Sequence, residues 1–294
     1  MIKLGFIGAG TVGTALATRL SEKGYPVVAV SSRSYTSAEK LAQSIKDCHV
    51  LSSGQAVADA ADLIFITTPD DAIAPVVSQI EWRSRKNVVH CSGADSTETL
   101  KFAKSLGAQV GAFHPLQTFA SIKQAIDNLP GSTFAIEADE PLLTFLKDMA
   151  TSLGGHWIVL KAEDKVIYHT AAVIACNYLV TLVKLATDLW QNFNVPRQEA
   201  VRALMPLLQG TLNNIANVGI PQCLTGPIAR GDIGTIKKHI NALERVAPTM
   251  LTTYRELGRQ TIPIALGKGR IDEQRVKELE AILKSGGKSS ESNA

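Results

Sequence analysis

The chain has few cysteines and little net charge, and each shortage excludes classes of protein. Its 294 residues include only 4 cysteines, and no two of them show the Cys-x-x-Cys spacing of zinc or redox sites. We therefore expect neither a disulfide framework nor a metal site. The 30 basic residues nearly balance the 27 acidic ones and form no basic run, so the sequence predicts no nucleic-acid partner.

Long apolar runs are also missing. No uninterrupted run of 18 apolar residues occurs, and from this we predict no membrane-spanning helix. Glycines interrupt the apolar N-terminus, so we expect no signal peptide and a cytoplasmic location. Apolar residues still make up 45% of the chain and charged residues 19%, which is enough for a sizeable folded core.

Short apolar runs alternate with segments of helical spacing over the first 160 residues. The apolar runs are 2–7, 25–30, 62–67, 87–91, 109–113, 132–136 and 156–160. Such alternation is typical of βαβ units, and strands that are apolar throughout indicate a sheet covered on both faces. The sequence thus predicts an α/β fold whose N-terminal Rossmann domain, residues 1–160, has a mostly parallel sheet.

An all-helical pattern follows residue 160. Residues 163–192 contain no Gly or Pro and have apolar residues at helical spacing on more than one face, which predicts one long, buried helix. Further helices are predicted at 197–218, 234–245, 249–260 and 272–284. We assign residues 161–284 to a helical domain for substrate binding and dimerisation, and 285–294 to a disordered tail.

A dinucleotide-binding motif stands near the start of the chain. Gly8, Gly10 and Gly13 follow the first predicted strand and open the first predicted helix, which is the context that such a motif requires. Gly8 allows a tight turn, Gly10 lets a pyrophosphate approach the helix N-terminus, and Gly13 allows close packing. We count Thr11 and Val12 of the same turn among the cofactor-binding residues. The bland alternative is a glycine-rich turn without a ligand.

The end of the second predicted strand favours NADP(H) over NAD(H). An NAD site has Asp or Glu about 20 residues beyond the glycines, whereas this chain has Ser31, Ser32 and Arg33 there. Two hydroxyls and a guanidinium can bind a 2′-phosphate that no carboxylate repels. The alternative is that Arg33 is only a solvated loop residue.

Polar residues also end the next two predicted strands. Thr67, Thr68 and Pro69 follow one strand, and Ser92 follows the next. Ligands of open α/β sheets bind at this carboxyl edge. We therefore expect the first three residues to line the cofactor site and Ser92 to lie near the nicotinamide and the substrate.

Several residues could carry the chemistry of a reductase. His114 follows another strand, and Lys165 and His169 share one stripe of the long helix, with Asn177 further along it. His169 is the first choice as proton donor because an imidazole titrates near neutral pH, and Lys165 is the second. Each histidine also has a structural interpretation: His114 stands next to a proline in a loop, where a His can be purely structural, and His169 is a lone His in an apolar helix, which is usually a packed residue.

Arg230 lies in an unusual segment between two predicted helices, Leu224-Thr-Gly-Pro-Ile-Ala-Arg-Gly-Asp232. Its planar guanidinium could bind a substrate carboxylate. Alternatively, it could pair with Asp232 and fix the turn.

Together these motifs resemble a known family. The segments 8–13, 114–118, 165–177 and 224–232 look like the Rossmann-like oxidoreductases that carry domain of unknown function 2520, in the 6-phosphogluconate dehydrogenase-like superfamily. The resemblance implies similarity to pyrroline-5-carboxylate reductase and to alternative ketopantoate reductases. A Lys-x-x-x-Asn-x-x-x-Asn helix of the latter matches His169, Val173 and Asn177 here, which places His169 where those relatives have Lys. It also implies dimerisation through the helical domain.

The sequence as a whole predicts an NADPH-dependent reductase of a small 2-oxo acid, with ketopantoate as a candidate substrate implied by the resemblance. A non-catalytic NADP-binding sensor is the alternative. It is favoured because this chain has His169 where the relatives have Lys and lacks the glutamate of their second domain. A methyltransferase is disfavoured because segment 31–34 lacks the acidic residue that such sites use to bind ribose. We expect a homodimer.

Overall fold

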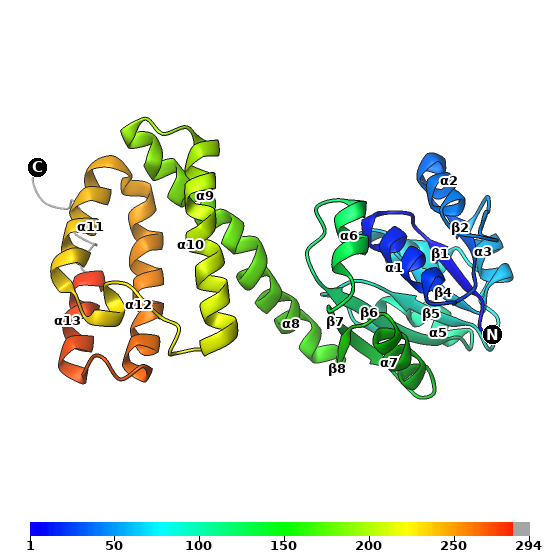
Figure 1. Cartoon of the computed structure of the whole chain (residues 1–294). Coiled ribbons are helices and arrows are strands. Elements are labelled where there is room, and N and C mark those ends of the chain that lie inside the picture. The colour runs from blue at the N-terminus through cyan, green and yellow to red at the C-terminus, as the bar shows by residue number, and fades with distance from the viewer. Residues whose placement is uncertain (285–294) are drawn as a thin grey trace, which may run out of the picture. The chain divides into compact units, whose positions relative to one another are not determined.

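The computed structural model describes residues 1–284, which divide into two compact units with a boundary between Asn177 and Tyr178 (Figure 1). The sequence had placed a boundary at residue 160, where the sheet ends. The difference arises because the helical segment after the sheet makes hydrogen bonds back to the first unit, for example from Tyr168 to His114. The predicted disordered tail, 285–294, lies outside the described residues.

One eight-stranded sheet forms the centre of the first unit, in the order β3-β2-β1-β4-β5-β6-β7-β8. The strands are β1 Leu4–Ile7, β2 Val27–Ser31, β3 His49–Val50, β4 Leu63–Ile66, β5 Asn87–His90, β6 Gln109–Leu116, β7 Thr133–Ala138 and β8 His156–Val159. All neighbours are parallel except β6 and β7. The mostly parallel sheet is thus confirmed, while the two-residue β3 was too short to predict.

Helices cover both faces of the sheet. They are α1 Thr11–Glu22, α2 Tyr35–Gln43, α3 Gly54–Ala60, α4 Asp70–Ser78, α5 Lys101–Ser105, α6 Ile122–Asn128 and α7 Leu142–Ser152. Alternate residues of a strand point to opposite faces. Phe65 accordingly packs in the core with α1, α2 and α7, while Ile64 and Ile66 pack in the core with α3, α4 and α5.

Four phenylalanines form a continuous aromatic row through one of these two cores. Phe6, Phe65, Phe113 and Phe134 stand on β1, β4, β6 and β7, with ring centroids 5.0, 6.2 and 4.6 Å apart along the row. All four are completely buried. Burial of large rings in such contacts stabilises the sheet that carries the site.

The long helical stretch after the sheet differs from its prediction. It consists of α8 Lys165–Ala172, a π-helical turn Val173–Asn177 and α9 Tyr178–Trp190. The prediction that it is buried was wrong, because only Lys165 and Thr187 are buried within these elements. Its apolar side chains instead lie on the surface.

The same stretch bears on the prediction of no membrane-spanning helix. By length and composition alone, Ala162–Phe193 could cross a membrane, since an 18-residue window has a mean hydropathy of 1.7 and none of that window is buried. The sequence prediction counted only uninterrupted apolar runs, whereas a window average tolerates polar residues. A single helix of this kind is weak evidence for a membrane protein.

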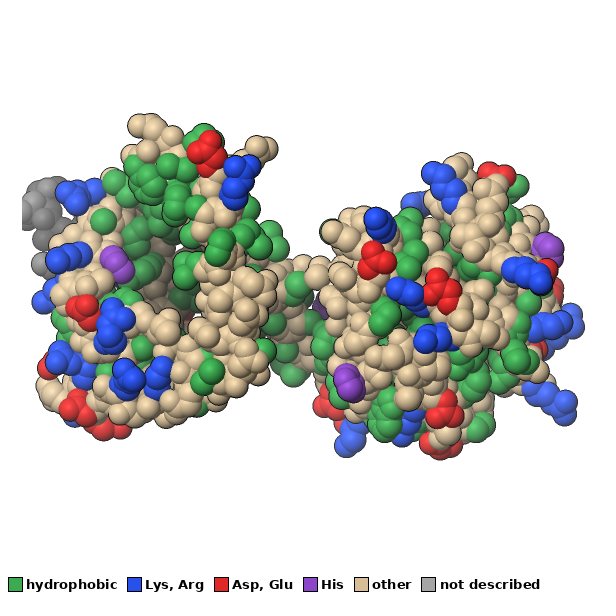
Figure 2. Space-filling model, in the orientation of Figure 1, with side chains coloured by type: hydrophobic (Ala, Val, Ile, Leu, Met, Phe, Trp, Pro, Cys, Tyr) green, Lys and Arg blue, Asp and Glu red, His purple; other side chains and the backbone are tan. Residues whose placement is uncertain are grey.

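The second unit contains two kinds of helix. Helix α10, Arg197–Val218, has only Ala200 buried, and Figure 2 shows hydrophobic side chains on the surface over α9 and α10. In contrast, α11 Ile233–Val246, α12 Leu251–Gly267 and α13 Glu273–Lys284 share a core of their own. Helix α12 continues beyond its predicted end at residue 260 because Ile262 and Ala265 are buried in that core.

Candidate functional site

The glycine-rich turn between β1 and α1 is the first part of the site. Gly8 has a positive φ of 111°, and a Cβ there would lie 2.7 Å from the carbonyl of Thr67. A Cβ on Gly13 would lie 2.6 Å from the carbonyl oxygen of Gly8 and would also strike the Thr67 side chain, so both positions require glycine. Thr67 Oγ1 donates to the Gly8 carbonyl at 2.7 Å and thereby holds the turn against the end of β4.

Gly10 differs from its two neighbours in the motif. A Cβ there would meet nothing within 4 Å, so no protein atom uses the space beside it. Gly10 is the N-cap of α1, and no side chain caps that helix. The first backbone N–H groups of α1 are therefore free for an anion such as a pyrophosphate.

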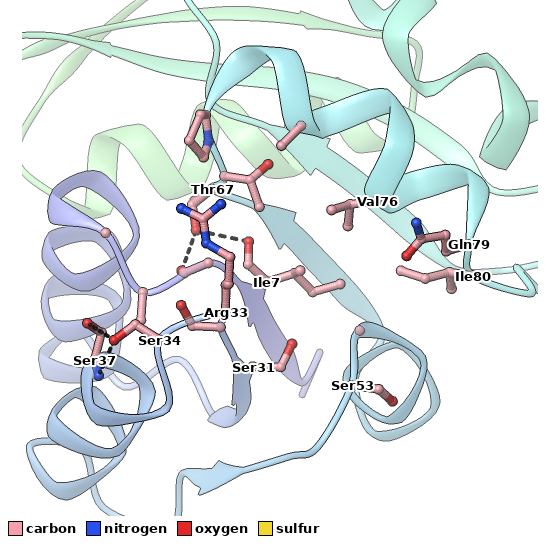
Figure 3. A pocket seen from close by; sticks show the side chains of 18 of the residues that line it. Ile7, Ser31, Arg33, Ser34, Ser37, Ser53, Thr67, Val76, Gln79 and Ile80 are labelled. Atoms are coloured by element: carbon pink, nitrogen blue, oxygen red, sulfur yellow. Dashed lines mark hydrogen bonds between the residues drawn. The ribbon is translucent and has the colours of Figure 1, made fainter.

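A cavity of about 610 Å³ opens beside this turn, at the carboxyl ends of β1, β2 and β4 (Figure 3). Of the residues predicted to bind the cofactor, those that line it are Gly8, Gly10, Ser31, Ser32, Arg33, Thr67, Thr68 and Pro69. Thr11, Val12 and Gly13 lie in α1 and are not among the lining residues. None of the lining residues is acidic, so no carboxylate would repel a phosphate there.

Arg33 lies exposed at this cavity, with its guanidinium directed over it in Figure 3. Among the described residues it has no ion pair or hydrogen bond. Ser34 is occupied differently, since its Oγ caps α2 by accepting from the Ser37 backbone N–H at 3.3 Å and from the Ser37 hydroxyl at 2.9 Å. The free cation of this loop is thus Arg33.

A second cluster lies where β5 and β6 meet α8. Lys165 is 1% exposed, and its Nζ donates to the carbonyl oxygen of Ser92 at 2.9 Å. His114 Nδ1 and the Tyr168 hydroxyl are 2.8 Å apart. A Cβ on Gly93 would lie 2.6 Å from His169 Nδ1 and 2.9 Å from His114 Nε2, so the two imidazoles meet directly above this glycine.

His169 has a polar atom without a partner. Its Nδ1 is buried and makes no hydrogen bond. An unpaired buried polar atom costs free energy, and such exceptions mark strained, functional or ligand-binding positions. Within the described residues, the nitrogen thus lies unpaired beside Gly93.

Burial keeps the other imidazoles of this region neutral at pH 7. Burial, together with the nearby Lys165 and His169, lowers the pKa of His114 to about 4. Burial and Lys165 likewise lower the pKa of His90 to about 3. Burial lowers the pKa of Lys165 below its usual value, although the charge of Glu137 partly opposes this shift. Burial also raises the pKa of Tyr168 to about 12.

The structure brings four predicted residues together: His114, Lys165, His169 and Ser92. Asn177 is exposed at the end of the π-helical turn, and its side chain makes no hydrogen bond within residues 1–284. Arg230 belongs to the second unit, in the 3-10 turn Ile228–Arg230. It forms no ion pair with Asp232, whose carboxylate instead accepts from the backbone N–H and the hydroxyl of Thr235.

From the sequence, no role was assigned to Tyr168 or to Gly93. Tyr168 stands three residues after Lys165 and so shares its helix face, a signal that was present in the sequence. The requirement for Gly93 depends on two imidazoles from distant segments and could not be read locally. Within residues 1–284, no group of three or more His, Cys, Asp or Glu side chains is arranged to hold a metal ion.

Two family models cover most of the chain. Residues 1–115 match the Rossmann-like domain, and residues 132–261 match a domain of unknown function, DUF2520. The predicted resemblance to Rossmann-like proteins carrying this domain is thereby confirmed. A search of curated proteins gave no match.

Solved structures share the fold over nearly the whole chain. A "putative NADP oxidoreductase" from Bacteroides fragilis is 28% identical with a TM-score of 0.73, covering 89% of this chain and 98% of its own. A Thermotoga maritima protein is 25% identical with a TM-score of 0.74, covering 91% and 100%. Pyrroline carboxylate reductase from Plasmodium falciparum, with NADP bound, is 16% identical with a TM-score of 0.60, covering 96% and 98%, and shows the fold alone.

Proposed function

We propose that this chain, a Rossmann-like domain followed by a DUF2520 domain, is an NADPH-dependent reductase of a small 2-oxo acid. The observation that carries the proposal is the pairing of two features in one unit. One is a cavity with a glycine turn, a free arginine and no carboxylate. The other is a buried lysine with imidazoles at the adjacent strand ends. Together they suit a phosphorylated dinucleotide and an anionic substrate.

The residues of the cavity fit NADPH. The backbone at Gly10 and the uncapped N-terminus of α1 would hold the pyrophosphate. Arg33 and Ser32 would bind the 2′-phosphate. The bound nicotinamide supplies the hydride, and the protein supplies orientation, charge and the proton.

The cluster above Gly93 suits the acceptor. The Lys165 amine, held at the Ser92 carbonyl oxygen, would donate a hydrogen bond to an anionic substrate at this end of β5. Reduction of a carbonyl group would leave negative charge on its oxygen, and a residue of this cluster would supply the proton that neutralises it. His169 is our proton donor, because its Nδ1 is buried and unpaired. Lys165 is the second choice, with one N–H already bound to Ser92, and His114 is the third because burial keeps its imidazole neutral. Asn177 and Arg230 remain proposed substrate-binding residues, and ketopantoate remains a proposed substrate.

The decisive experiment is turnover of NADPH with a panel of 2-oxo acids that includes ketopantoate. His169→Ala should lower the turnover rate by about 10²–10⁴-fold, the scale of a lost general acid, while NADPH binds normally. His49→Ala, an exposed histidine on β3, is the matched control and should keep full turnover. Full turnover in His169→Ala would move the proton donor to Lys165 or His114.

The same panel separates the alternatives. Binding of NADPH without reduction of any 2-oxo acid would favour the non-catalytic sensor. If only cyclic imino acids were reduced, the chain would still be a reductase, but the bond that it reduces would be C=N rather than C=O.

The choice of cofactor has its own test. Arg33→Ala should cost roughly 1.5–3 kcal/mol of NADPH affinity, the scale of a hydrogen bond to a charged group, and leave NADH binding nearly unchanged. Isothermal titration of both cofactors measures this difference. Equal losses of affinity for NADPH and NADH would show that Arg33 does not bind the 2′-phosphate.

The homodimer is also part of the proposal. Large apolar side chains of α8, α9 and α10 lie exposed, among them Ile167 at 73%, Val180 at 69% and Leu207 at 67%. Exposed apolar surface of this extent marks an interaction site. A second copy of the chain, bringing an identical apolar surface, would cover it.

A further inference from the structure

One face of α4 forms an apolar wall of the cavity. Ala72 and Val76 are one helical turn apart, Gln79 follows at the end of the helix, and all three line the cavity. The buried Ile80 lines the same region. The wall is thus apolar, with an amide group at one end.

Arg33 lies across the cavity from this wall, as Figure 3 shows. A guanidinium on one side and aliphatic side chains on the other suit the two faces of a planar aromatic ring. Under the proposed function, the pyrophosphate would be held at the glycine turn and the 2′-phosphate at Arg33. The ring that enters this slot is therefore the adenine of the proposed cofactor.

The cavity contains two glutamines, and they differ in their bonding. Gln55 is fully used: its Oε1 accepts from the Glu81 backbone N–H at 2.8 Å, and its Nε2 donates to Asp59 at 3.2 Å. Gln79 is exposed, and within the described residues its side chain makes no hydrogen bond. Its amide therefore offers both a donor and an acceptor to a ligand.

We propose that Gln79 recognises the adenine ring of the cofactor through the exocyclic amino group. A glutamine amide matches an adenine edge because its oxygen accepts from the N6 amino group while its nitrogen donates to a ring nitrogen. Whichever edge faces Gln79, the amino group is the shared contact. Gln79 thus restricts the site to adenine nucleotides, an inference that rests on the proposed function.

The test compares NADP⁺ with its 1,N6-etheno analogue, in which the amino group is blocked. Isothermal titration would use the wild-type chain, Gln79→Leu and the control Gln43→Leu, an exposed glutamine at the end of α2 outside the cavity. The wild type should bind NADP⁺ about three- to tenfold more tightly than the analogue, the scale of one or two hydrogen bonds. Gln79→Leu should lose this preference by weakening NADP⁺ alone, and Gln43→Leu should keep it.

Other outcomes overturn the inference in distinguishable ways. Equal weakening of both nucleotides by Gln79→Leu, or no weakening of either, would show that Gln79 does not contact the amino group. A wild type that binds NADP⁺ without preference over the analogue would also overturn it while leaving the proposed function intact. A wild type that binds neither nucleotide would overturn both.

Discussion

The sheet and the helices α8–α10 contain similar apolar side chains, which are buried on the sheet and exposed on these helices. On the sheet, Phe6, Phe65, Phe113 and Phe134 are fully buried against one another and against covering helices. On α10, in contrast, Leu207 is 67% exposed and Leu212 is 48% exposed. The first unit therefore completes its core within one chain, whereas this helical region does not.

The incomplete burial is confined to part of the helical region. Helices α11, α12 and α13 bury Ile236, Ile262 and Leu279 in a core of their own. A generally loose helical unit would not show this contrast. The difference teaches that apolar periodicity predicts which residues seek burial, and that only the structure shows whether the same chain supplies the partner.

The largest effect is expected from placing charged residues on the exposed apolar surface of α10. We expect a homodimer at micromolar concentration in sedimentation, and Leu207→Asp combined with Leu212→Asp should convert it to a monomer because two buried, unpaired carboxylates would oppose association. Leu106→Asp, on a residue 44% exposed in the first unit, is the control and should stay dimeric.

Two results would contradict this prediction. One is a monomeric wild type at micromolar concentration. The other is a chain that is recovered only with detergent, which would assign the apolar stretch Ala162–Phe193 to a membrane instead.

A smaller effect should separate buried from exposed aromatic residues within the first unit. Phe113→Ala should lower the free energy of unfolding of this unit by about 3–5 kcal/mol, because it removes a ring from the middle of the aromatic row. Phe102→Ala, on a ring that is 41% exposed, should change it by about 0.5 kcal/mol or less. Urea unfolding followed by tryptophan fluorescence measures both, and similar losses would refute the assigned core.

A further prediction concerns pH. The pKa values of His90 and His114 are lowered to about 3 and about 4 in the folded chain, so between there and about 6.5 the unfolded chain binds more protons. The contribution of these two histidines to the free energy of unfolding is therefore fully present above about pH 6.5, and it is lost as the pH falls toward 4. Each histidine contributes at most about 1.4 kcal/mol per pH unit.

Denaturation midpoints at pH 7, 6 and 5 would measure this slope. His114→Gln should reduce it by about half, whereas His49→Gln, on an exposed histidine, should leave it unchanged. A flat profile in the wild type would show that the two imidazoles are not buried in neutral form.

Local patterns were sufficient to predict eight of the residues that line the cavity beside the glycine turn. The glycine turn, Arg33 and the polar strand ends were each identified from their position relative to a strand, because parallel strands bring their carboxyl ends to one edge. Helix α10 was predicted with its observed bounds, since Pro196 and Gly219 flank a continuous apolar pattern.

Contacts between distant segments could not be predicted in this way. The His114–Tyr168 hydrogen bond joins residues 54 positions apart, and the need for Gly93 depends on side chains from β6 and α8. The burial of the long helix was predicted wrongly because its apolar faces exceed what one chain covers. Sequence periodicity carries no information about whether an apolar helix face packs against its own chain or against another molecule.

The space beside Gly10 has a consequence for how the chain can change. Gly8 and Gly13 serve the fold itself, because a methyl group at either would collide with neighbouring backbone. At Gly10 the same methyl group would collide with no atom of the protein and would meet only what enters from outside. An alanine there would clash with no described atom of the protein, and under the proposed function it would obstruct the pyrophosphate, so a substitution at this residue could remove the function without disturbing the fold.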